Sequence, residues 1–180
     1  VSIDSQGNQA NSNSDAAVIS ADGRYVAFNS SASNLVYGDY GSKRDVFVHD
    51  RLTGQTTRVS VNSDGDGGNL DVTYQNPSIS SNGRYISFSS KATNMVPNDT
   101  NEKEDVFLHD RQTGETIIVS VDSNGNQTTY NTSHHSLSQN GSYVAFDSSA
   151  PNLVPNDTND VTDLFVHHAI QENDIINVDL

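Results

Sequence analysis

The sequence predicts an all-β protein built from β-propeller blades, and three observations support this prediction. A unit of about 60 residues occurs three times, as residues 1–58, 59–118 and 119–180. Within each unit the apolar residues form short runs, rich in β-branched and aromatic types and bounded by Gly, Asn, Asp and Ser, which is typical of strands. Short glycine turns alternate with long polar loops, as in the four-stranded blades of a propeller. We therefore expect residues 1–180 to form a single β-propeller segment of three four-stranded repeats.

Four motifs carry the repeat. Val-Ser-Ile-Asp-Ser at residues 1–5 returns as Val-Ser-Val-Asn-Ser at 59–63 and Val-Ser-Val-Asp-Ser at 119–123. Gly-Arg-Tyr-Val-Ala-Phe at 23–28 returns at 83–88 and 141–146 with small changes, and Asn-Leu-Val at 34–36 returns at 94–96 and 152–154. Asp-Val-Phe-Val-His-Asp-Arg at 45–51 returns at 105–111 and, altered, at 163–169. A β-sandwich is the rival fold, but it would not predict this repetition.

In the middle unit the apolar runs predict strands over residues 77–80, 84–90, 105–110 and 115–121. The turns between the first and second strands and between the third and fourth are tight and contain Gly83 and Gly114, which can adopt positive φ. The connections over residues 91–104 and 122–135 are long and polar. In a blade both long connections lie on the same face of the disc, so we expect binding through loops to use that face.

The two ends of the chain lead us to expect association. Three blades are too few to close a ring, because propellers contain about four to eight. Residues 1–3 match the end of a fourth strand that belongs to no blade of this sequence, and residues 174–180 are the expected fourth strand of the third blade. The chain begins in mid-pattern, as expected for a processed protein or a fragment. We predict either further blades outside this chain or self-association by strand exchange, which would give a six-bladed ring or a filament.

The motif Ser-x-Asn/Asp-Gly-Arg-Tyr-Val/Ile-x-Phe-x-Ser, followed by Asp-Val-Phe-x-His-Asp-Arg-x-Thr-Gly, resembles the TolB-like (WD-related) β-propeller repeat over essentially the whole chain. The resemblance extends to secreted bacterial and archaeal proteins that repeat this unit in tandem. It implies an extracellular or periplasmic location and a scaffolding role with protein or glycan partners. Some members of the family are fused to hydrolases. The third unit departs from the motif at Ser142, His168 and Ala169, as expected for a terminal or interface blade.

The charge excludes two classes of partner. The chain has a formal net charge of -14, and residues 112–180 contain nine carboxylates and no Lys or Arg. Such a surface repels phosphate backbones and anionic lipids, so we expect no nucleic-acid binding and no membrane insertion. The absence of cysteine excludes disulfides, thiolate zinc sites and cysteine nucleophiles.

The strongest candidate chemistry is calcium binding in the loop between the second and third strands. Side-chain oxygens at loop positions 1, 3 and 7 resemble the opening of a calcium loop, where hard oxygen ligands surround a hard cation. In the first unit Gly41 takes the place of the asparagine. The alternative interpretation is that these residues cap turns and begin the third strand. The predicted Ca²⁺ ligands are Asp99, Asn101 and Asp105, then Asp157, Asn159 and Asp163, and in the first unit Asp39 and Asp45.

Other candidate groups favour structural interpretations. Residues 64–71, Asp-Gly-Asp-Gly-Gly-Asn-Leu-Asp, have a calcium-like composition but are not repeated, so we interpret them as a flexible solvated loop. His49, His109 and His167 share one position in the third strand, and we expect each to be hydrogen-bonded across blades. His134 and His135 are adjacent and point to opposite sides of an extended chain, which is poor geometry for a metal.

No catalytic motif appears: the chain has no Gly-x-Ser-x-Gly elbow, no His-Glu-x-x-His and no phosphate loop. The sequence therefore predicts a non-enzymatic extracytoplasmic propeller that acts as a scaffold or adhesion module, stabilised by calcium and self-associating. Two alternatives stay open. One is the propeller domain of a secreted hydrolase, and the other is a lectin-like module that binds glycans through polar loops and exposed tyrosines.

Overall fold

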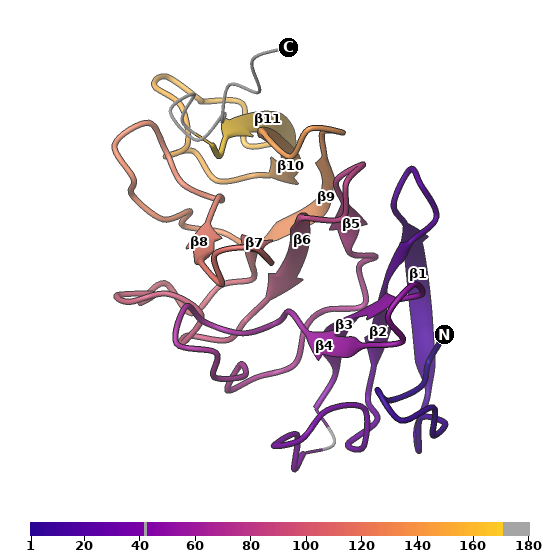
Figure 1. Cartoon of the computed structure of the whole chain (residues 1–180). Helices are drawn as coiled ribbons and strands as arrows, with labels where there is room; N and C mark the ends of the chain where they lie inside the picture. Colours follow the sequence, from indigo (N-terminus) through magenta and orange to yellow (C-terminus); the bar gives the residue numbers. More distant parts are fainter. Residues whose placement is uncertain (42, 171–180) are drawn as a thin grey trace.

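The computed structural model describes residues 1–41 and 43–170, which fold into three antiparallel β-sheets that follow one another along the chain (Figure 1). These residues contain no helix. The sheets have the strand orders β1-β2-β3-β4, β5-β6-β7-β8 and β11-β10-β9, and we call them blades 1, 2 and 3. The predicted all-β fold of propeller blades is confirmed. The strands are β1 (Ser14–Ile19), β2 (Tyr25–Ser30), β3 (Asp45–Asp50), β4 (Thr56–Arg58), β5 (Ser78–Ile79), β6 (Tyr85–Ser90), β7 (Asp105–Asp110), β8 (Thr116–Ile118), β9 (Thr132–Leu137), β10 (Tyr143–Ser148) and β11 (Asp163–His168).

The strands of blade 2 lie where the sequence predicted them. The second and third match to within a residue, and the first and fourth are shorter than predicted, although Val119 N, just beyond β8, still donates to Val106 O at 2.9 Å. The expected fourth strand of blade 3, residues 174–180, lies outside the described residues. In the described part of the chain, blade 3 therefore has three strands.

The turn between the first and second strands follows directly from the repeated Ser-x-Asn/Asp-Gly-Arg motif. In blade 2, Ser80 Oγ donates to Asn82 Oδ1 at 2.8 Å and accepts from Tyr85 N at 3.0 Å. Asn82 Oδ1 also accepts from Arg84 N at 3.0 Å, and Gly83 adopts a φ of +71°, which favours glycine. The motif therefore encodes a local hydrogen-bonded turn.

A bidentate ion pair joins the second and third strands of blades 1 and 2. Arg84 Nε and Nη2 donate to Asp110 Oδ1 and Oδ2 at 2.9 and 2.6 Å, and Arg24 pairs with Asp50 in the same way. The Arg24 guanidinium holds the pKa of Asp50 well below its usual range. Blade 3 has lost both partners together, and the Tyr143 ring stacks instead on His168, one of the replacing residues, at 4.7 Å.

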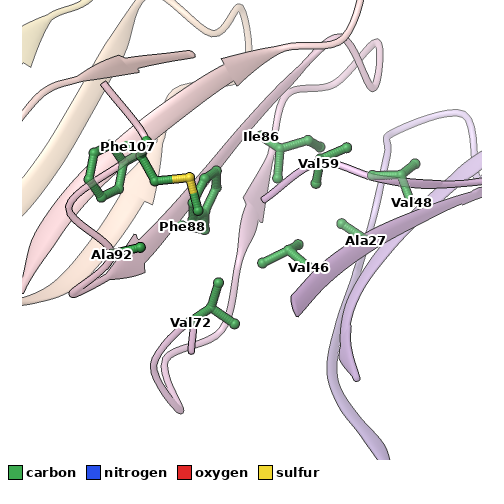
Figure 2. Close-up of a cluster of buried hydrophobic side chains, with 10 residues drawn as sticks. Ala27, Val46, Val48, Val59, Val72, Ile86, Phe88, Ala92 and Phe107 are labelled. Atoms are coloured by element: carbon green, nitrogen blue, oxygen red, sulfur yellow. The ribbon is translucent and has the colours of Figure 1, made fainter. Parts of the chain in front are cut away.

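The hydrophobic core lies between successive blades. Blades 1 and 2 share one cluster, shown in Figure 2, and blades 2 and 3 share another. In blade 2, β6 and β7 therefore contribute side chains to both neighbouring blades, as in propeller packing. The first cluster is Ala27, Val46, Val48, Val59, Val72, Ile86, Phe88, Ala92, Met95 and Phe107, and the second is Tyr85, Val106, Leu108, Val119, Leu137, Val144, Phe146, Ala150 and Leu153.

Candidate functional site

One contact is repeated at both blade interfaces: a tyrosine of one blade covers a glycine turn of the next. A Cβ added to Gly83 would lie 2.2 Å from Tyr25 Cδ2, and one added to Gly141 would lie 2.2 Å from Tyr85 Cδ2. Arg111 completes the first contact, because its Nη1 donates to Gly83 O at 2.7 Å and its guanidinium lies 4.5 Å from the Tyr25 ring centroid. The tyrosine and the glycine of the motif therefore recognise each other across blades.

Blade 3 exposes the face that blades 1 and 2 bury. Leu164 and Val166 are 85% and 70% exposed, whereas the equivalent Val46 and Val48 of blade 1 are buried. Tyr143, which corresponds to Tyr25, is also exposed. We call this surface, Tyr143, Leu164, Val166 and His168, the outer face of blade 3. Large exposed apolar side chains on one face mark an interaction site.

At the opposite end of the molecule, blade 1 has a glycine turn that no tyrosine of the described chain covers. Arg51 Nη1 donates to Gly23 O at 2.7 Å, which is the arrangement of Arg111 and Gly83, but no tyrosine covers Gly23 within the described residues. A cavity of about 220 Å³ opens beside it on the same blade, lined in part by Val26 and Phe28. We call this surface the free face of blade 1.

A histidine–threonine relay holds the fourth strand of blades 1 and 2. His109 Nδ1 lies 2.9 Å from Thr116 Oγ1, whose hydroxyl donates to Val61 O. Because the hydroxyl has one hydrogen, Nδ1–H of the histidine must donate to the threonine, so the ring carries a proton on Nδ1. Blade 1 repeats this with His49 and Thr56. The sequence predicted that these histidines form hydrogen bonds across blades. This is wrong, because β3 and β4 pair His49 directly with Thr56 inside one blade.

Burial lowers the pKa of His109 to about 4, with a small opposing contribution from Asp110. The unfolded chain takes up a proton below a pH of about 6.5, whereas the folded chain does so only near 4, so the stabilisation from this residue is lost as the pH falls. We expect the difference in free energy of unfolding between wild type and His109→Asn to be about 1–2 kcal/mol smaller at pH 5 than at pH 7. Urea titrations at both pH values measure it. A difference that does not change with pH would contradict the assignment.

In blade 3 the same groups border an open groove. His167, Val121 and Ser123 correspond to His109, Val61 and Ser63, and they line a cavity of about 500 Å³ along β11. In blade 2 the corresponding groups hold Thr116, whose backbone N donates to Ser63 Oγ at 3.0 Å. We call this cavity the strand-4 groove. At the positions of Thr116, Val119 and Ser120, the third unit has Asp174, Asn177 and Val178, so its own tail lacks the residues that this groove would hold.

The N-terminal residues 1–5, of which 1–3 are predicted to match the end of a fourth strand, contact β4. Ile3 O accepts from Thr56 Oγ1 at 2.6 Å, and Ser5 Oγ accepts from Thr56 N at 3.0 Å, so the segment from Ile3 onward packs on β4 of its own blade. Residues 1–3 are nevertheless part of none of the three sheets, and Val61 and Ser63 make the same contacts with Thr116 of the next blade. Val1 is exposed and corresponds to Val59, which together with Ser60 ends the fourth strand of the preceding blade. Only Val1 and Ser2 are therefore placed to act on another blade.

The predicted metal ligands have different surroundings in the three blades. In blade 1, Arg58 Nη1 lies 3.6 Å from Asp39 Oδ1 and 3.8 Å from Asp45 Oδ2. The guanidinium fits because its neighbour is glycine: a Cβ on Gly67 would lie 2.7 Å from it. The glycine-rich loop that we interpreted as flexible and solvated therefore makes room for a buried cation.

In blade 2 the equivalent Asp99 and Asp105 are 8% and 0% exposed. Asp105 Oδ1 accepts from Ser120 Oγ at 2.6 Å. Asp99 Oδ1 and Asp105 Oδ2 have no hydrogen-bond partner among the described residues. Asn101 Oδ1 accepts from Lys103 N of its own loop at 2.9 Å, and its Nδ2 donates to Thr128 O of the connection after β8 at 3.1 Å.

In blade 3 the predicted ligands are more open. Asp157 and Asp163 are only partly buried, and Asn159 Nδ2 donates to Asp163 Oδ2 at 3.1 Å. Across residues 1–41 and 43–170, no three His, Cys, Asp or Glu side chains converge on a position that could hold a metal ion. A cation at any of these loops would therefore need neutral oxygen ligands as well.

One serine–histidine pair was not foreseen. Ser87 Oγ lies 3.0 Å from His135 Nδ1, but Ser87 is fully buried, and burial lowers the pKa of His135 to about 4. The nearby carboxylate of Asp147 contacts His134, on the other face of β9, at 3.1 Å. The serine is closed to substrate and its histidine is a weak base, so this pair has the properties of core packing.

Among the described residues there is also no helix long and apolar enough to span a membrane.

Comparison with known proteins gives a result only for solved structures. No family model matches the chain. No curated protein matches it. The chain is similar to a prolyl endopeptidase structure, with 15% identity and a TM-score of 0.50, covering 87% of this chain and 20% of that one. It is also similar to TolB from Acinetobacter baumannii (17% identity, TM-score 0.48, covering 89% of this chain and 30% of that one) and to the β-propeller domain of the Trilobed protease from Pyrococcus furiosus (11%, 0.47, 77% and 35%).

At these identities the likeness shows the fold alone. It confirms that the chain consists of β-propeller blades, and the predicted TolB-like repeat is confirmed at that level. The chain spans 30% of the TolB structure and 20% of the prolyl endopeptidase structure. The residues described here thus form an open part of a propeller.

Proposed function

We propose that this chain is a non-enzymatic propeller scaffold that associates head to tail, with the outer face of blade 3 packing on the free face of blade 1 of a second copy. The observation that carries the proposal is the repeated contact between blades. Its tyrosine side is exposed on blade 3, and its glycine side is uncovered on blade 1. Tyr143 of one copy would cover Gly23 and contact Arg51 of the next, as Tyr25 covers Gly83 beside Arg111.

Apolar and charged groups both support this pairing. Leu164 and Val166 would be removed from water against the surface beside Val26 and Phe28, as Val46 and Val48 are buried between blades 1 and 2. The three repeats carry net charges of -1, -5 and -8, so the most acidic unit would meet the unit that holds five of the nine basic residues. Contact between units 3 and 1 therefore brings less like charge together than contact of unit 3 with itself, which favours the head-to-tail orientation.

The N-terminus would add a short strand contact. Ser60 and Ser120 each donate to the aspartate that begins the third strand of their blade, Asp45 and Asp105, at 2.6 Å. Ser2 occupies the same motif position, and Asp163 is the corresponding aspartate of blade 3. In the associated form Ser2 of the second copy would bond Asp163, as in β-strand addition.

Head-to-tail contacts either close into a ring or continue as a filament. Two copies of three blades would make a six-bladed ring, which lies within the usual range of about four to eight. The TolB-like motif supports an extracytoplasmic location for such a scaffold. The alternative, a propeller domain of a secreted hydrolase, rests on peptidases among the similar structures, whose likeness concerns the fold.

Light scattering at micromolar concentration tests the association. Wild type is expected to form a species of at least twice 19.4 kDa. The variant Leu164→Arg with Val166→Arg is expected to be a folded monomer, because both side chains are exposed in the isolated chain and would be desolvated only in the assembly. Leu52→Arg, also exposed but on a tight turn, is the matched control and should associate normally. A monodisperse, thermally stable wild-type monomer would refute the proposal.

A further inference from the structure

Two carboxylates in blade 2 are buried together without a counter-charge. Asp99 and Asp105 are 8% and 0% exposed, and they occupy the positions of Asp39 and Asp45, which in blade 1 both lie within 4 Å of the same Arg58 nitrogen. Neither residue forms a salt bridge among the described residues, and one oxygen of each, Asp99 Oδ1 and Asp105 Oδ2, has no hydrogen-bond partner there. Burial of charged groups without a partner is costly, so at neutral pH such a pair is stabilised either by a proton on one carboxyl group or by a compensating positive charge.

Blade 1 shows where that charge belongs. The corresponding carboxylate atoms, Asp39 Oδ1 and Asp45 Oδ2, are the two that approach the Arg58 guanidinium. In the strand register Arg58 pairs with Phe47, and its equivalent in blade 2, Ile118, pairs with Phe107. The two blades therefore have the same carboxylate pair, and blade 2 has lost the protein's own cation.

We propose that a calcium ion occupies this position in blade 2, bound by Asp99 Oδ1 and Asp105 Oδ2 in place of the guanidinium. Oxygen is the only donor type that the pair offers, which favours a hard cation over zinc. The remaining ligands are neutral, because no third carboxylate or histidine of the described chain converges on them. Calcium accepts irregular sets of carboxylate, carbonyl and water oxygens, whereas magnesium demands near-octahedral geometry.

A solvent-filled space lies next to the pair, although neither carboxylate lines it. A cavity of about 610 Å³ is lined by Ile118 and by Thr100, the neighbour of Asp99. Gln127, which borders the same cavity, takes the place of Gly67: Val121 pairs with Gln127 as Val61 pairs with Gly67. A guanidinium at position 118 would meet this larger side chain, so blade 2 has also lost the space that Arg58 uses. Both differences separate the calcium site of blade 2 from the arginine site of blade 1.

Only blade 2 would bind calcium in this way, which gives one ion per chain. In blade 1 the arginine holds the position, and in blade 3 Asn159 bonds Asp163 in a more open loop. The site is independent of head-to-tail association, because it lies on neither the outer face of blade 3 nor the free face of blade 1. Failure of one proposal therefore leaves the other unaffected.

Thermal melting in chelator, in 10 mM CaCl₂ and in 10 mM MgCl₂, together with calorimetric titration of CaCl₂, tests the site. For a dissociation constant of about 1 mM, calcium is expected to raise the melting temperature of wild type by about 3–6 °C, and magnesium by clearly less. Titration should give one site per chain. The absence of a rise with calcium, or an equal rise with magnesium, would overturn the proposal.

Three variants locate the ion. Asp105→Asn keeps the shape of the side chain and its bond from Ser120 but removes the charge, and it should abolish the rise. Ile118→Arg with Gln127→Gly copies blade 1 into blade 2, and it should also abolish the rise by supplying the cation. Asp157→Asn with Asp163→Asn is the matched control in blade 3 and should respond like wild type. A full calcium response in Asp105→Asn, or its loss in the blade 3 control, would place the ion elsewhere and refute the assignment.

Discussion

Replacement of Phe107 by alanine is expected to lower the free energy of unfolding by about 3–5 kcal/mol, because it removes a large fully buried ring and leaves a cavity. Phe107 is 0% exposed and stacks on Phe88, with ring centroids 5.7 Å apart. Both rings belong to the cluster that joins blades 1 and 2 (Figure 2). The loss therefore affects the contact between two blades as well as the packing within one.

Phe165→Ala is the matched control for this prediction. Phe165 occupies the same position in blade 3 and stacks on Phe146 at the same 5.7 Å, but it is only partly buried in the isolated chain. Its replacement should cost about 1–2 kcal/mol less than that of Phe107. Urea unfolding followed by circular dichroism, at a concentration where the chain is monomeric, gives both values. Equal losses would mean that full burial of Phe107 between blades 1 and 2 adds no more stability than the partly buried position of Phe165 beside the blade 2–blade 3 cluster.

Gly83→Ala is expected to cost about 2–5 kcal/mol, the second largest effect, from two sources. The φ of Gly83 is +71°, a left-handed conformation that is strained for alanine. In addition, the new Cβ would lie 2.2 Å from Tyr25 Cδ2, so the ring of the neighbouring blade would have to move. The variant therefore tests the tyrosine–glycine contact on which the head-to-tail model is based.

Gly114→Ala separates the two sources. Gly114 lies in the other tight turn of the same blade, with a φ of +81° and no atom within 4 Å of an added Cβ. Its replacement should cost only the backbone strain, about 1–2 kcal/mol. Denaturant titrations of the two variants give the cost of the clash by subtraction. If both variants lose the same stability, the tyrosine ring does not hold the blades together at this point.

The blade itself could be predicted from the sequence because its determinants are local. Ser80, Asn82 and Gly83 make a turn by hydrogen bonds between residues at most five apart, and the strands on either side alternate between two buried faces. Each unit repeats these short-range patterns, so reading one unit predicted the strands of the others. The altered third unit could also be recognised, since Ser142 and His168 both stand where the motif has ion-pair partners.

The candidate sites depended on contacts that the local pattern does not specify. The three acidic loops look alike in the sequence, yet one faces Arg58, one faces Ile118, and in the described residues the third meets no fourth strand. The residue that faces the carboxylates is set by the register of strands 3 and 4. The space for it is set by the next connection, which has Gly67 in one unit and Gln127 in the other. In the same way, Ile3 resembles a free strand by its motif, but the register of β4 brings Thr56 to its carbonyl.

By itself, the sequence determined the repeat, the blade and the turn chemistry, because hydrogen bonds between near neighbours and strand periodicity are properties of short segments. Only the tertiary structure decided which carboxylates of blade 2 lack a counter-charge and which apolar face of blade 3 is left uncovered. The first depends on which residue the fourth strand places beside the carboxylates of its own blade, and the second arises where one blade meets another. The physical reason is that burial and electrostatic compensation depend on what lies across an interface, and the sequence pattern of a single unit carries no information about its neighbour.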